Sequence, residues 1–511
     1  MTTVTLTVNN VWTAMTGDAE VRRLLDEAFS YDVPNAERTP AFKMKKWDGK
    51  KHLLTRYDNF PTGLLNDALD VLDHFKVKVV DKRVRPVHDF KKWALIGAEE
   101  RQHQTEAIVA ALEDGRGIIH HATGAGKTEV MAGIIQMIDL RSLVLVHQKS
   151  IAEQTQKRIK DRLGLKKVGL YSSGKRIDAP ITVATFQTLQ SAMEEDKENK
   201  SNRVAQWMSQ FHVVCIDEAH HSSARTFQNV INACPAYYRY GFSATPMRTE
   251  DRPTYLHIVG STGPVIDRFT AGEGVSKGFL VKANITMVKW FKDNPQEWWK
   301  AYDFDINDWN YTYSGKKTEK VTKANGKTYR RPLPPDKWEP GLYEVAIVQN
   351  KVRNSYVVDS IAALVDDGLT VLVLVEHIAH GELLKRAVER ETGARVVFLQ
   401  GGDAMKDRAK GTKMLTEGTV QVLIATTIFD EGVDIPAIDG LVFAGGGKAQ
   451  HRYIQRLGRG MRPKRGKTGL EVVDFYDTHS KIMWRHSEER LTAYESDKGA
   501  YEVVIDNLTT A

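Results

Sequence analysis

The chain has 511 residues, more than one hydrophobic core can organise, and its 41% hydrophobic and 27% charged content is typical of a globular protein with about three domains. Two cysteines, Cys215 and Cys234, exclude a disulfide framework and a zinc site, and the net charge of +7 favours a polyanionic partner. No apolar run reaches the roughly 18 residues of a membrane span and no basic-then-apolar leader opens the chain, so we expect a cytoplasmic protein without a membrane partner.

Residues 1–92 predict a small α/β domain with a candidate nucleic-acid-binding hairpin. Periodic apolar residues give the order βαββαβ, with strands at 4–8, 42–44, 52–55 and 77–80 and helices at 20–29 and 63–75. The middle of this domain is a basic hairpin with lysines on both sides of Trp47. Lys46 is placed to contact phosphate and Trp47 to stack on a base, although a solvated hairpin with Trp47 folded inward fits the same residues.

Charges and Pro86 predict a linker at about 81–92, and residues 93–282 predict the first of two larger α/β lobes. The opening helix of this lobe follows Gly97 and contains Arg101 and Gln104. The Gln104 amide is both a donor and an acceptor, so it can read the edge of an adenine, whereas a lone glutamine could also be an ordinary surface residue.

An apolar strand that ends at His121 leads into Ala122-Thr123-Gly124-Ala125-Gly126-Lys127-Thr128, and a helix follows. The two glycines allow successive backbone N–H groups to point inward, so the loop can hold a polyphosphate at the positive end of the helix. We expect Lys127 to reach the β- and γ-phosphates of ATP and Thr128 to bind the bridging magnesium ion. His121 stands where the phosphate-loop pattern has its first glycine, and an ordinary strand-to-helix loop is the alternative.

Strands predicted at 143–146, 181–184, 213–216 and 240–242 alternate with helices. This alternation is typical of a doubly wound parallel sheet, whose ligands gather at the carboxyl ends of the strands. Asp217 and Glu218 directly follow one of these strands. We expect Asp217 to hold magnesium and Glu218 to orient and deprotonate the attacking water, with a helix N-cap as the structural alternative.

Residues 283–340 form an insertion that is rich first in aromatic and then in basic residues and fits neither α/β block. It is a candidate strand-separating wedge or junction clamp, or else a structural hairpin. A second α/β lobe without a phosphate loop is predicted at 341–480, and a helical tail at 481–511. The strands of this lobe are expected at 371–375, 396–399, 422–425 and 440–443.

In chain order, these segments resemble the motifs of superfamily 2 DEAH-box helicases across most of residues 98–476. The resemblance rests on Gln104 (Q motif), 121–128 (I), 144–148 (Ia), 183–187 (Ib), 217–220 (II), 243–245 (III), 373–377 (IV), 424–434 (V) and 455–462 (VI). It implies two tandem RecA-like lobes, each a doubly wound parallel sheet, that together hydrolyse ATP with magnesium.

The same resemblance assigns further site residues. In motif VI, Gln455, Arg459 and Arg462 would be catalytic, with both arginines reaching the γ-phosphate across a cleft between the lobes. The nucleotide site would also include His220, Gly432 and Asp434. Strand ends would grip the nucleic-acid backbone without sequence preference through His147, Thr185, His377 and Thr426. The pair His147-Gln148 departs from the proline-threonine that is common in motif Ia.

Residues 42–50 and 61–64 of the leading domain resemble the phage UvsW-type helicases. This resemblance implies a DNA helicase that acts on branched, forked or single-stranded DNA in recombination, repair or replication, in the cytoplasm of the host. It would regress forks and migrate junctions with 3′-to-5′ polarity. Two alternatives are an ATP-gated duplex-DNA translocase or clamp that does not separate strands, as in a restriction subunit, and an RNA helicase, because the core motifs do not distinguish the two sugars.

Overall fold

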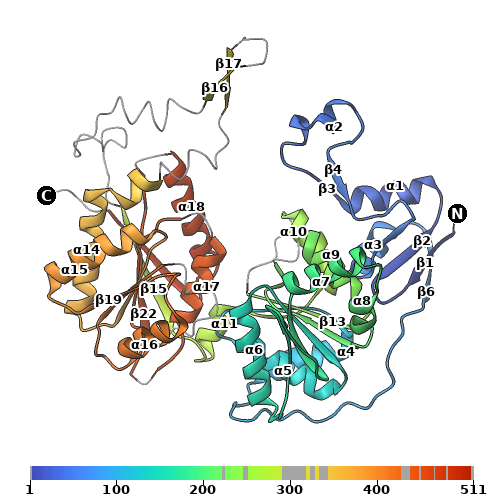
Figure 1. The fold of residues 1–511 in the computed structure, drawn as a ribbon, viewed down its shortest axis with the longest axis horizontal. Helices are drawn as coiled ribbons and strands as arrows, with labels where there is room; N and C mark the ends of the chain where they lie inside the picture. The colour runs from blue at the N-terminus through green and yellow to red at the C-terminus, as the bar shows by residue number, and fades with distance from the viewer. Residues whose placement is uncertain are drawn as a thin grey trace. The chain divides into compact units, whose positions relative to one another are not determined.

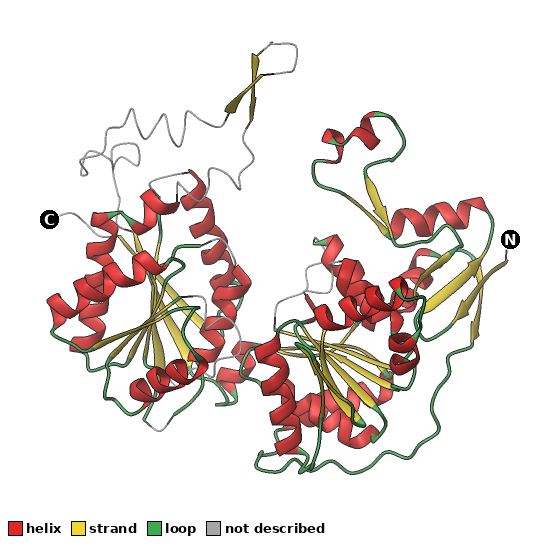
Figure 2. Cartoon of the chain, viewed as in Figure 1, coloured by secondary structure: helices red, strands yellow, loops and turns green. Residues whose placement is uncertain are grey.

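The computed structural model describes residues 3–220, 225–244, 251–289, 318–322, 328–332, 343–426, 438–447, 450–464, 466–478 and 481–507. The chain divides into two compact units, Met1–Thr270 and Ala271–Ala511. Figure 1 labels the helices and strands, and Figure 2 shows that helices flank a central sheet in each unit. The two largely parallel sheets confirm the predicted fold class of tandem RecA-like lobes, preceded by a small α/β domain.

The N-terminal domain is built on a four-stranded sheet in the order β5-β2-β1-β6. Alternate residues of the first strand, Val4, Leu6 and Val8, are buried, as are Val21 and Leu25 of the first helix, so each element has one apolar face turned to the core. The elements are β1 (Thr3–Val8), β2 (Trp12–Thr16), α1 (Ala19–Ala28), β5 (Asn59–Pro61), α3 (Leu65–Val71) and β6 (Lys76–Asp81).

A separate two-stranded ribbon, β3 (Ser30–Asp32) and β4 (Lys50–His52), carries a short helix, α2 (Pro40–Lys43), at its tip (Figure 1). The predicted strand at Phe42–Met44 is therefore wrong, and the order βαββαβ does not describe this domain strand by strand. The Thr39 side chain accepts the N–H of Phe42 as an N-cap and Pro40 lies in the first turn, so the local sequence begins a helix.

The first lobe has an eight-stranded sheet in the order β10-β9-β11-β8-β12-β13-β7-β14, and every neighbouring pair except β10 with β9 is parallel. The strands predicted in this region are all present. The eight strands of the sheet are β7 (Arg116–His121), β8 (Ser142–Val146), β9 (Gly169–Ser172), β10 (Lys175–Ile177), β11 (Ile181–Thr185), β12 (Val213–Ile216), β13 (Tyr238–Ser243) and β14 (Val265–Phe269), of which β9, β10 and β14 were not predicted. The helices are α4 (Gln102–Asp114), α5 (Lys127–Ile138), α6 (Lys149–Arg162), α7 (Phe186–Glu198), α8 (Arg203–Met208), α9 (Arg225–Ala233) and α10 (Arg252–Thr262).

The N-terminal domain and the first lobe share one hydrophobic core. Leu64 and Ala68 belong to the same buried cluster as Ile258 and Val259 of α10. The two backbones approach so closely that a Cβ on Gly63 would lie 1.8 Å from the carbonyl oxygen of Val259. The domain is therefore fixed on α10 and is not tethered by a flexible linker alone.

The segment predicted as a linker lies along the first lobe. From this segment Lys91 N donates to Met137 O at 2.8 Å, and Ile96 N, four residues beyond the predicted end of the linker at 92, donates to Arg162 O at 2.8 Å. Trp93 packs against the core between them. The charged composition of this stretch therefore reflects its exposed face, while its backbone and Trp93 bind it to α5 and α6.

The second unit has a seven-stranded sheet in the order β19-β20-β18-β21-β22-β15-β23, in which all neighbours are parallel. The strands are β15 (Lys282–Lys289), β18 (Val371–Leu374), β19 (Val396–Leu399), β20 (Val422–Ala425), β21 (Gly440–Phe443), β22 (Gly469–Phe475) and β23 (Tyr501–Asn507). The helices are α11 (Ala271–Ser276), α14 (Lys351–Asp366), α15 (Ile378–Thr392), α16 (Met405–Thr416), α17 (Gln450–Gly460) and α18 (Lys481–Glu495), with a π-helical turn at Glu344–Val348.

Two segments outside the predicted second lobe belong to its sheet. The strand β15 pairs with β22, so the chain enters this sheet at Lys282, and the compact unit begins at Ala271. The predicted C-terminal helix is α18, and β23 follows it and pairs with β15. Within the insertion, β16 (Thr318–Thr322) and β17 (Thr328–Pro332) form an antiparallel hairpin.

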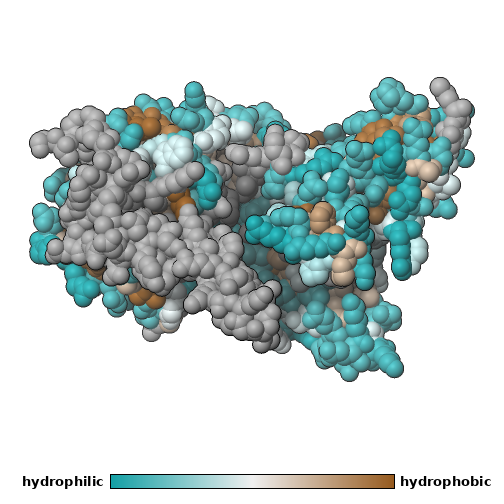
Figure 3. All heavy atoms as spheres, turned by 90° about the horizontal axis from the view of Figure 1, so that it is seen from above, coloured by the Kyte–Doolittle hydropathy of each residue, from teal (hydrophilic) through white to brown (hydrophobic). Residues whose placement is uncertain are grey.

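On the face seen in Figure 3, the described atoms are mostly hydrophilic, with small scattered hydrophobic areas. Among the described helices, none has the length and apolar content needed to cross a bilayer.

Candidate nucleotide and nucleic-acid sites

The phosphate loop joins β7 to α5 as predicted. Gly124 and Gly126 both have φ of +90°, and Gly126 is the N-cap of α5. These left-handed angles are the ones that glycine adopts without strain, and they allow the loop N–H groups to face a bound anion. Lys127 opens the helix and donates through Nζ to the carbonyl oxygen of His121 at 3.2 Å. Thr128 is the next residue, and both lie at the positive end of a twelve-residue helix.

The loop also contains a polar atom that suits a ligand. The Oγ1 atom of Thr123 is buried and has no hydrogen-bond partner among the described residues. A buried hydroxyl without a partner is costly, so a phosphate oxygen that accepts from it would relieve that cost. The residues present therefore fit a nucleotide triphosphate.

The histidine that replaces the first glycine is part of a second structural layer. His121 is buried, and its Nε2 donates to Asp267 on β14 at 2.5 Å. The ring of His103 stacks on Phe269 of the same strand, with centroids 3.9 Å apart and planes 10° apart. Sequence reasoning missed Asp267, Phe269 and His103, because no local pattern links residues on α4, β7 and β14.

The predicted adenine reader contacts the phosphate loop. Gln104 lies buried on α4 and donates through Nε2 to the carbonyl oxygen of Ala125 at 3.1 Å, and His103 donates to the same oxygen at 2.9 Å. Arg101 is the N-cap residue of α4, one turn before Gln104. Gln104 is therefore in direct contact with the phosphate loop. A base bound at Gln104 would lie next to the hydrogen bond between Gln104 and Ala125.

The acidic pair ends the strand β12. The N–H of Asp217 donates to Leu145 O at 2.9 Å, and the N–H of Glu218 donates to the Asp217 carboxylate at 3.1 Å. Glu218 has φ of +48°, which is a strained backbone for a residue with a side chain and is often found at functional sites. Burial and the neighbouring Glu218 raise the pKa of Asp217 to about 6, against the opposing effect of Lys127.

His220 connects this pair to motif III. Its Nδ1 lies 3.4 Å from a Glu218 carboxylate oxygen and 3.3 Å from Ser243 Oγ. Ser243 ends β13, the neighbour of β12 in the sheet. His220 therefore contacts residues at the ends of both strands, β12 and β13. Thr245 of the Ser243-Ala244-Thr245 motif lies outside the described residues.

An open groove lies at the carboxyl ends of β8 and β11, and it brings together two predicted nucleic-acid contacts, His147 and Thr185. The helices α6 and α7 both begin there, so two positive helix ends face it. The Thr185 hydroxyl is 2.7 Å from that of Thr188, which accepts the N–H of Ser173 at 3.3 Å. The groove is further lined by Gln148 and Gln187 of the predicted motifs and by Lys149, Ser150, Ser173 and Thr188, which the sequence did not single out.

The motif VI residues lie on one face of α17 and its C-terminal end. Gln455 and Arg459 are four residues apart on α17, which places them on one side of the helix, and Arg462 lies two residues beyond its end at Gly460. All three are half-buried, whereas Tyr453 and Leu457 on the opposite side are buried. These residues belong to the second unit and Lys127, Asp217 and Glu218 to the first, so a joint role of the two sets stays a prediction.

The other predicted contacts of the second unit end adjacent strands. His377 follows β18 as the N-cap of α15, and Thr426 follows β20, which pairs with β18 in parallel. His377 Nδ1 is 3.2 Å from a Glu344 carboxylate oxygen. Gly432 and Asp434 lie outside the described residues.

The basic arm at residues 33–51 keeps Lys46 exposed and Trp47 half-buried. The indole N–H of Trp47 donates to the carbonyl oxygen of Lys50 at 2.6 Å. Gly49, with φ of +86°, lies against the Phe42 ring, where a Cβ would be 2.9 Å from a ring carbon. The arm is therefore an ordered turn with an exposed lysine surface, and Trp47 has an internal role in it.

Two family models match the chain: "Type III restriction enzyme, res subunit" over residues 98–248, and "Helicase conserved C-terminal domain" over residues 354–464. The chain is 22% identical over 531 residues to the ATP-dependent DNA helicase uvsW of Enterobacteria phage T4, with 95% of each chain covered. It is 25% identical over 387 residues to the DNA 3'-5' translocase XPB2 of Sulfurisphaera tokodaii, covering 72% of this chain and 79% of the relative. The structure of the ATP-dependent Type ISP restriction-modification enzyme LlaBIII bound to DNA aligns with a TM-score of 0.54 at 15% identity, covering 81% of this chain and 32% of that chain, which shows a shared fold.

Proposed function

The chain is an ATP-dependent DNA helicase of superfamily 2, and we propose that it acts on branched DNA, regressing forks and migrating junctions with 3′-to-5′ polarity. The similarity to the ATP-dependent DNA helicase uvsW of phage T4 along 95% of both chains supports a DNA substrate, and the similarity to a DNA 3'-5' translocase supports the polarity. We further propose that it serves recombination, repair or replication of a phage in the host cytoplasm.

The observation that carries the proposal is the arrangement of one sheet edge. The phosphate loop follows β7, the acidic pair follows β12, and the groove with His147 follows β8, all at carboxyl ends of one parallel sheet. Because β12 pairs directly with β8, a change at Asp217 is one strand away from the groove. This layout suits an enzyme whose nucleotide state alters its grip on a nucleic-acid backbone.

We propose that Thr128 and Asp217 hold the magnesium ion that accompanies ATP. A hydroxyl and a carboxylate are oxygen ligands of the kind that magnesium favours, and magnesium would neutralise charge on the phosphates. Lys127 would bind the β- and γ-phosphates and Glu218 would accept a proton from the attacking water. Gln455 and Arg459 of α17, and Arg462 just beyond it, would complete hydrolysis by stabilising the transferring phosphoryl group.

The decisive experiment compares ATP hydrolysis and strand separation on a replication fork, a four-way junction, a blunt duplex, single-stranded DNA and RNA. We expect the fork and junction to be processed fastest. Hydrolysis stimulated by blunt duplex without strand separation would instead support a clamp or restriction-type translocase, the alternative that the res-subunit match favours. Preferential stimulation by RNA would overturn the DNA assignment.

Three variants connect the activity to the site. Lys127→Ala and Glu218→Gln should each lower ATP turnover by at least about 10²-fold, because each removes a group expected to act in the transition state. Lys160→Ala on the exposed side of α6 is the matched control and should keep wild-type turnover. If Lys127→Ala hydrolyses ATP as fast as this control, the phosphate loop is not the site.

We propose that the insertion containing β16 and β17 is a wedge or clamp at the junction. Deletion of residues 314–331 should keep ATP hydrolysis and abolish fork unwinding. Unchanged unwinding in that deletion would show that the hairpin has only a structural role.

A further inference from the structure

A short glycine loop, Ala444–Gly447, follows β21 on the way to α17, the helix that carries Gln455 and Arg459 of motif VI, and residues 448 and 449 between them lie outside the described residues. Gly446 in this loop has φ of +58°, in the left-handed region. A Cβ on Gly446 would lie 3.1 Å from both Arg353 Nη2 and Asp477 Oδ2, which is tighter than an ordinary contact. The left-handed backbone and the close approach of these two charged groups therefore both favour glycine at this position.

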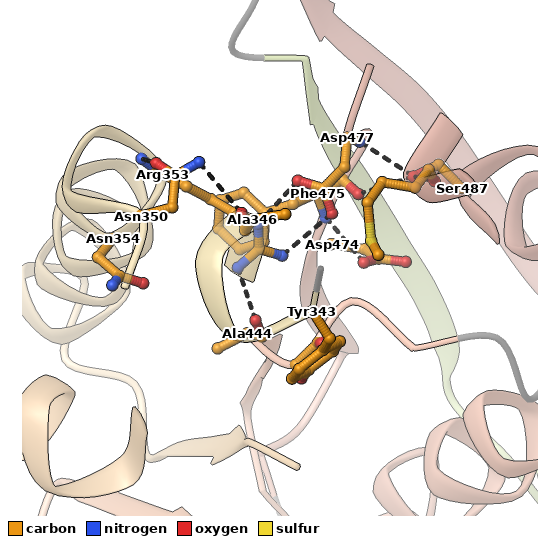
Figure 4. A network of polar contacts seen from close by, with 12 residues as sticks. Tyr343, Ala346, Asn350, Arg353, Asn354, Ala444, Asp474, Phe475, Asp477 and Ser487 are labelled. Carbon is orange, nitrogen blue, oxygen red and sulfur yellow. Dashed lines mark hydrogen bonds and ion pairs between the residues drawn. The ribbon is translucent and has the colours of Figure 1, made fainter. Parts of the chain in front are cut away.

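Two fully buried arginines hold carbonyl oxygens of the loop. Arg353 of α14 donates through Nη1 to Ala444 O at 2.7 Å, and its Nε and Nη2 bind the Asp477 carboxylate at 2.7 and 3.3 Å (Figure 4). Arg490 of α18 donates through Nη1 to Gly447 O at 3.0 Å and through Nε to Asp474 at 2.8 Å. Buried ion pairs add little net stability, but they favour one arrangement over others because each charge needs its partner.

Two tyrosines hold the remaining polar groups of the loop. The Tyr343 hydroxyl donates to the carbonyl oxygen of Gly445. The Tyr453 hydroxyl accepts the N–H of Gly447 at 2.7 Å. Four side chains from four different places in the chain therefore contact a loop of four residues: α14, α17, α18 and the segment that directly follows the insertion.

The same contacts orient α17. The Tyr453 ring lies between two guanidinium groups, Arg490 at 5.2 Å and Arg456 at 5.5 Å from its centroid. Arg456 also pairs with Glu376, the motif IV carboxylate, at 3.3 Å. With Tyr453 fixed on the inner side of the helix, Gln455, two residues further on, lies on the opposite side, and Arg459 follows it one turn later.

We propose that Tyr343 and Arg490 are positioning residues for ATP hydrolysis, which act through the glycine loop to set the start and rotation of α17. Neither residue lies within a segment that the two family models match, 98–248 or 354–464. Tyr343 follows the insertion and Arg490 belongs to the C-terminal helix, so both segments are linked to the motif VI arginines. The inference rests on the proposed role of α17 in hydrolysis.

The test uses conservative variants of the full chain, because loss of a buried arginine can prevent folding. Tyr343→Phe and Tyr453→Phe each remove one hydroxyl and keep the ring. We expect the DNA-stimulated kcat for ATP to fall about fivefold to tenfold, the size of one lost hydrogen bond, with KM within about twofold. Tyr501→Phe removes a hydroxyl from β23 at the edge of the sheet and should keep the wild-type kcat.

Wild-type kcat in both loop variants, or an equal loss in Tyr501→Phe, would overturn the inference. Arg490→Lys keeps the charge but not the fork of donors, so it should also lower kcat with little change in KM. Arg459→Ala, measured in parallel, separates a failure of the loop inference from a failure of the proposed role of α17. If Arg459→Ala is inactive while the loop variants hydrolyse normally, the loop inference alone fails; if Arg459→Ala is fully active, the role of α17 fails first.

Discussion

Gln104 donates its amide N–H to the carbonyl oxygen of Ala125, so the residue expected to read adenine also supports the phosphate loop. The neighbouring Gly126 leaves the space that this contact needs, because a Cβ there would lie 2.2 Å from Gln104 Nε2. The residue predicted to read the base and the loop predicted to bind phosphate are therefore in direct contact.

Gly126→Ala should weaken ATP binding about tenfold or more, because it both strains a left-handed backbone and displaces Gln104. Gly174→Ala is the matched control, since φ at Gly174 is +79° and a Cβ there meets nothing within 4 Å. The control carries the backbone strain without the collision. Equal ATP affinities for the two variants, measured by calorimetry, would show that the Gln104 contact does not matter.

The phosphate loop and the elements on either side of it could be predicted from the sequence. The strand, the glycine turn and the helix that begins at Lys127 occupy consecutive residues, so their pattern is visible without a structure. The packing of His121 is different, because its partner Asp267 is 146 residues away and reaches it only when β14 pairs with β7. The periodic spacing of apolar residues in the sequence cannot predict such a long-range contact.

Lys46→Gln should lower the affinity for DNA and reduce the slope of log affinity against log salt by about one, as expected for one lost phosphate contact. Lys46 is exposed on the basic arm. Lys76→Gln, at an exposed position of β6, removes the same charge elsewhere in the domain and should leave the slope unchanged. Identical salt slopes for both variants and the wild type would remove the arm from the DNA-binding surface.

The incorrect prediction of a strand at residues 42–44 of the basic arm has a physical cause. Phe42 and Met44 are apolar residues that occur in strands, but Thr39 and Pro40 form a helix start just before them. An N-cap followed by proline in the first turn outweighs the weak strand preference of three residues. The strand β23 was missed for the opposite reason: most of its residues are exposed, so its apolar alternation does not mark a core face.

His380→Gln should make the second unit less sensitive to acid. His380 is fully buried and hydrogen-bonds to Asn354 at 2.9 Å, and burial, together with the positive charge of Arg353, lowers its pKa to about 3. The folded state therefore stays neutral where the unfolded histidine, with a pKa near 6.5, takes up a proton. Its contribution to stability is complete above pH 6.5 and is lost as the pH falls toward 3, at up to roughly 1.4 kcal/mol per pH unit.

Urea unfolding of the full chain at several values between pH 5 and 7 checks this prediction. The wild type should lose stability more steeply than His380→Gln as the pH falls, because glutamine keeps a donor but cannot take up a proton. His212→Gln, at an exposed position, should follow the wild type. Parallel pH profiles for His380→Gln and the wild type would contradict a neutral buried histidine.

Gly63→Ala should lower the thermal unfolding midpoint by roughly 5–10 °C, because the added methyl group would force apart the N-terminal domain and α10. The nearest atom, Val259 O, belongs to a backbone and cannot move aside as a side chain would. Gly402→Ala is the control, since a Cβ at Gly402 enters open space. An unchanged midpoint for Gly63→Ala would show that this contact is not maintained in solution.

The buried cluster that unites Leu64 and Ala68 with Ile258 and Val259 bears on how the protein can be divided for study. Cutting the chain near residue 92 would expose a hydrophobic surface on each fragment, and both fragments would tend to aggregate at working concentrations. Biochemists who want a minimal motor from this chain should therefore keep its first eighty residues, even for assays that involve no DNA.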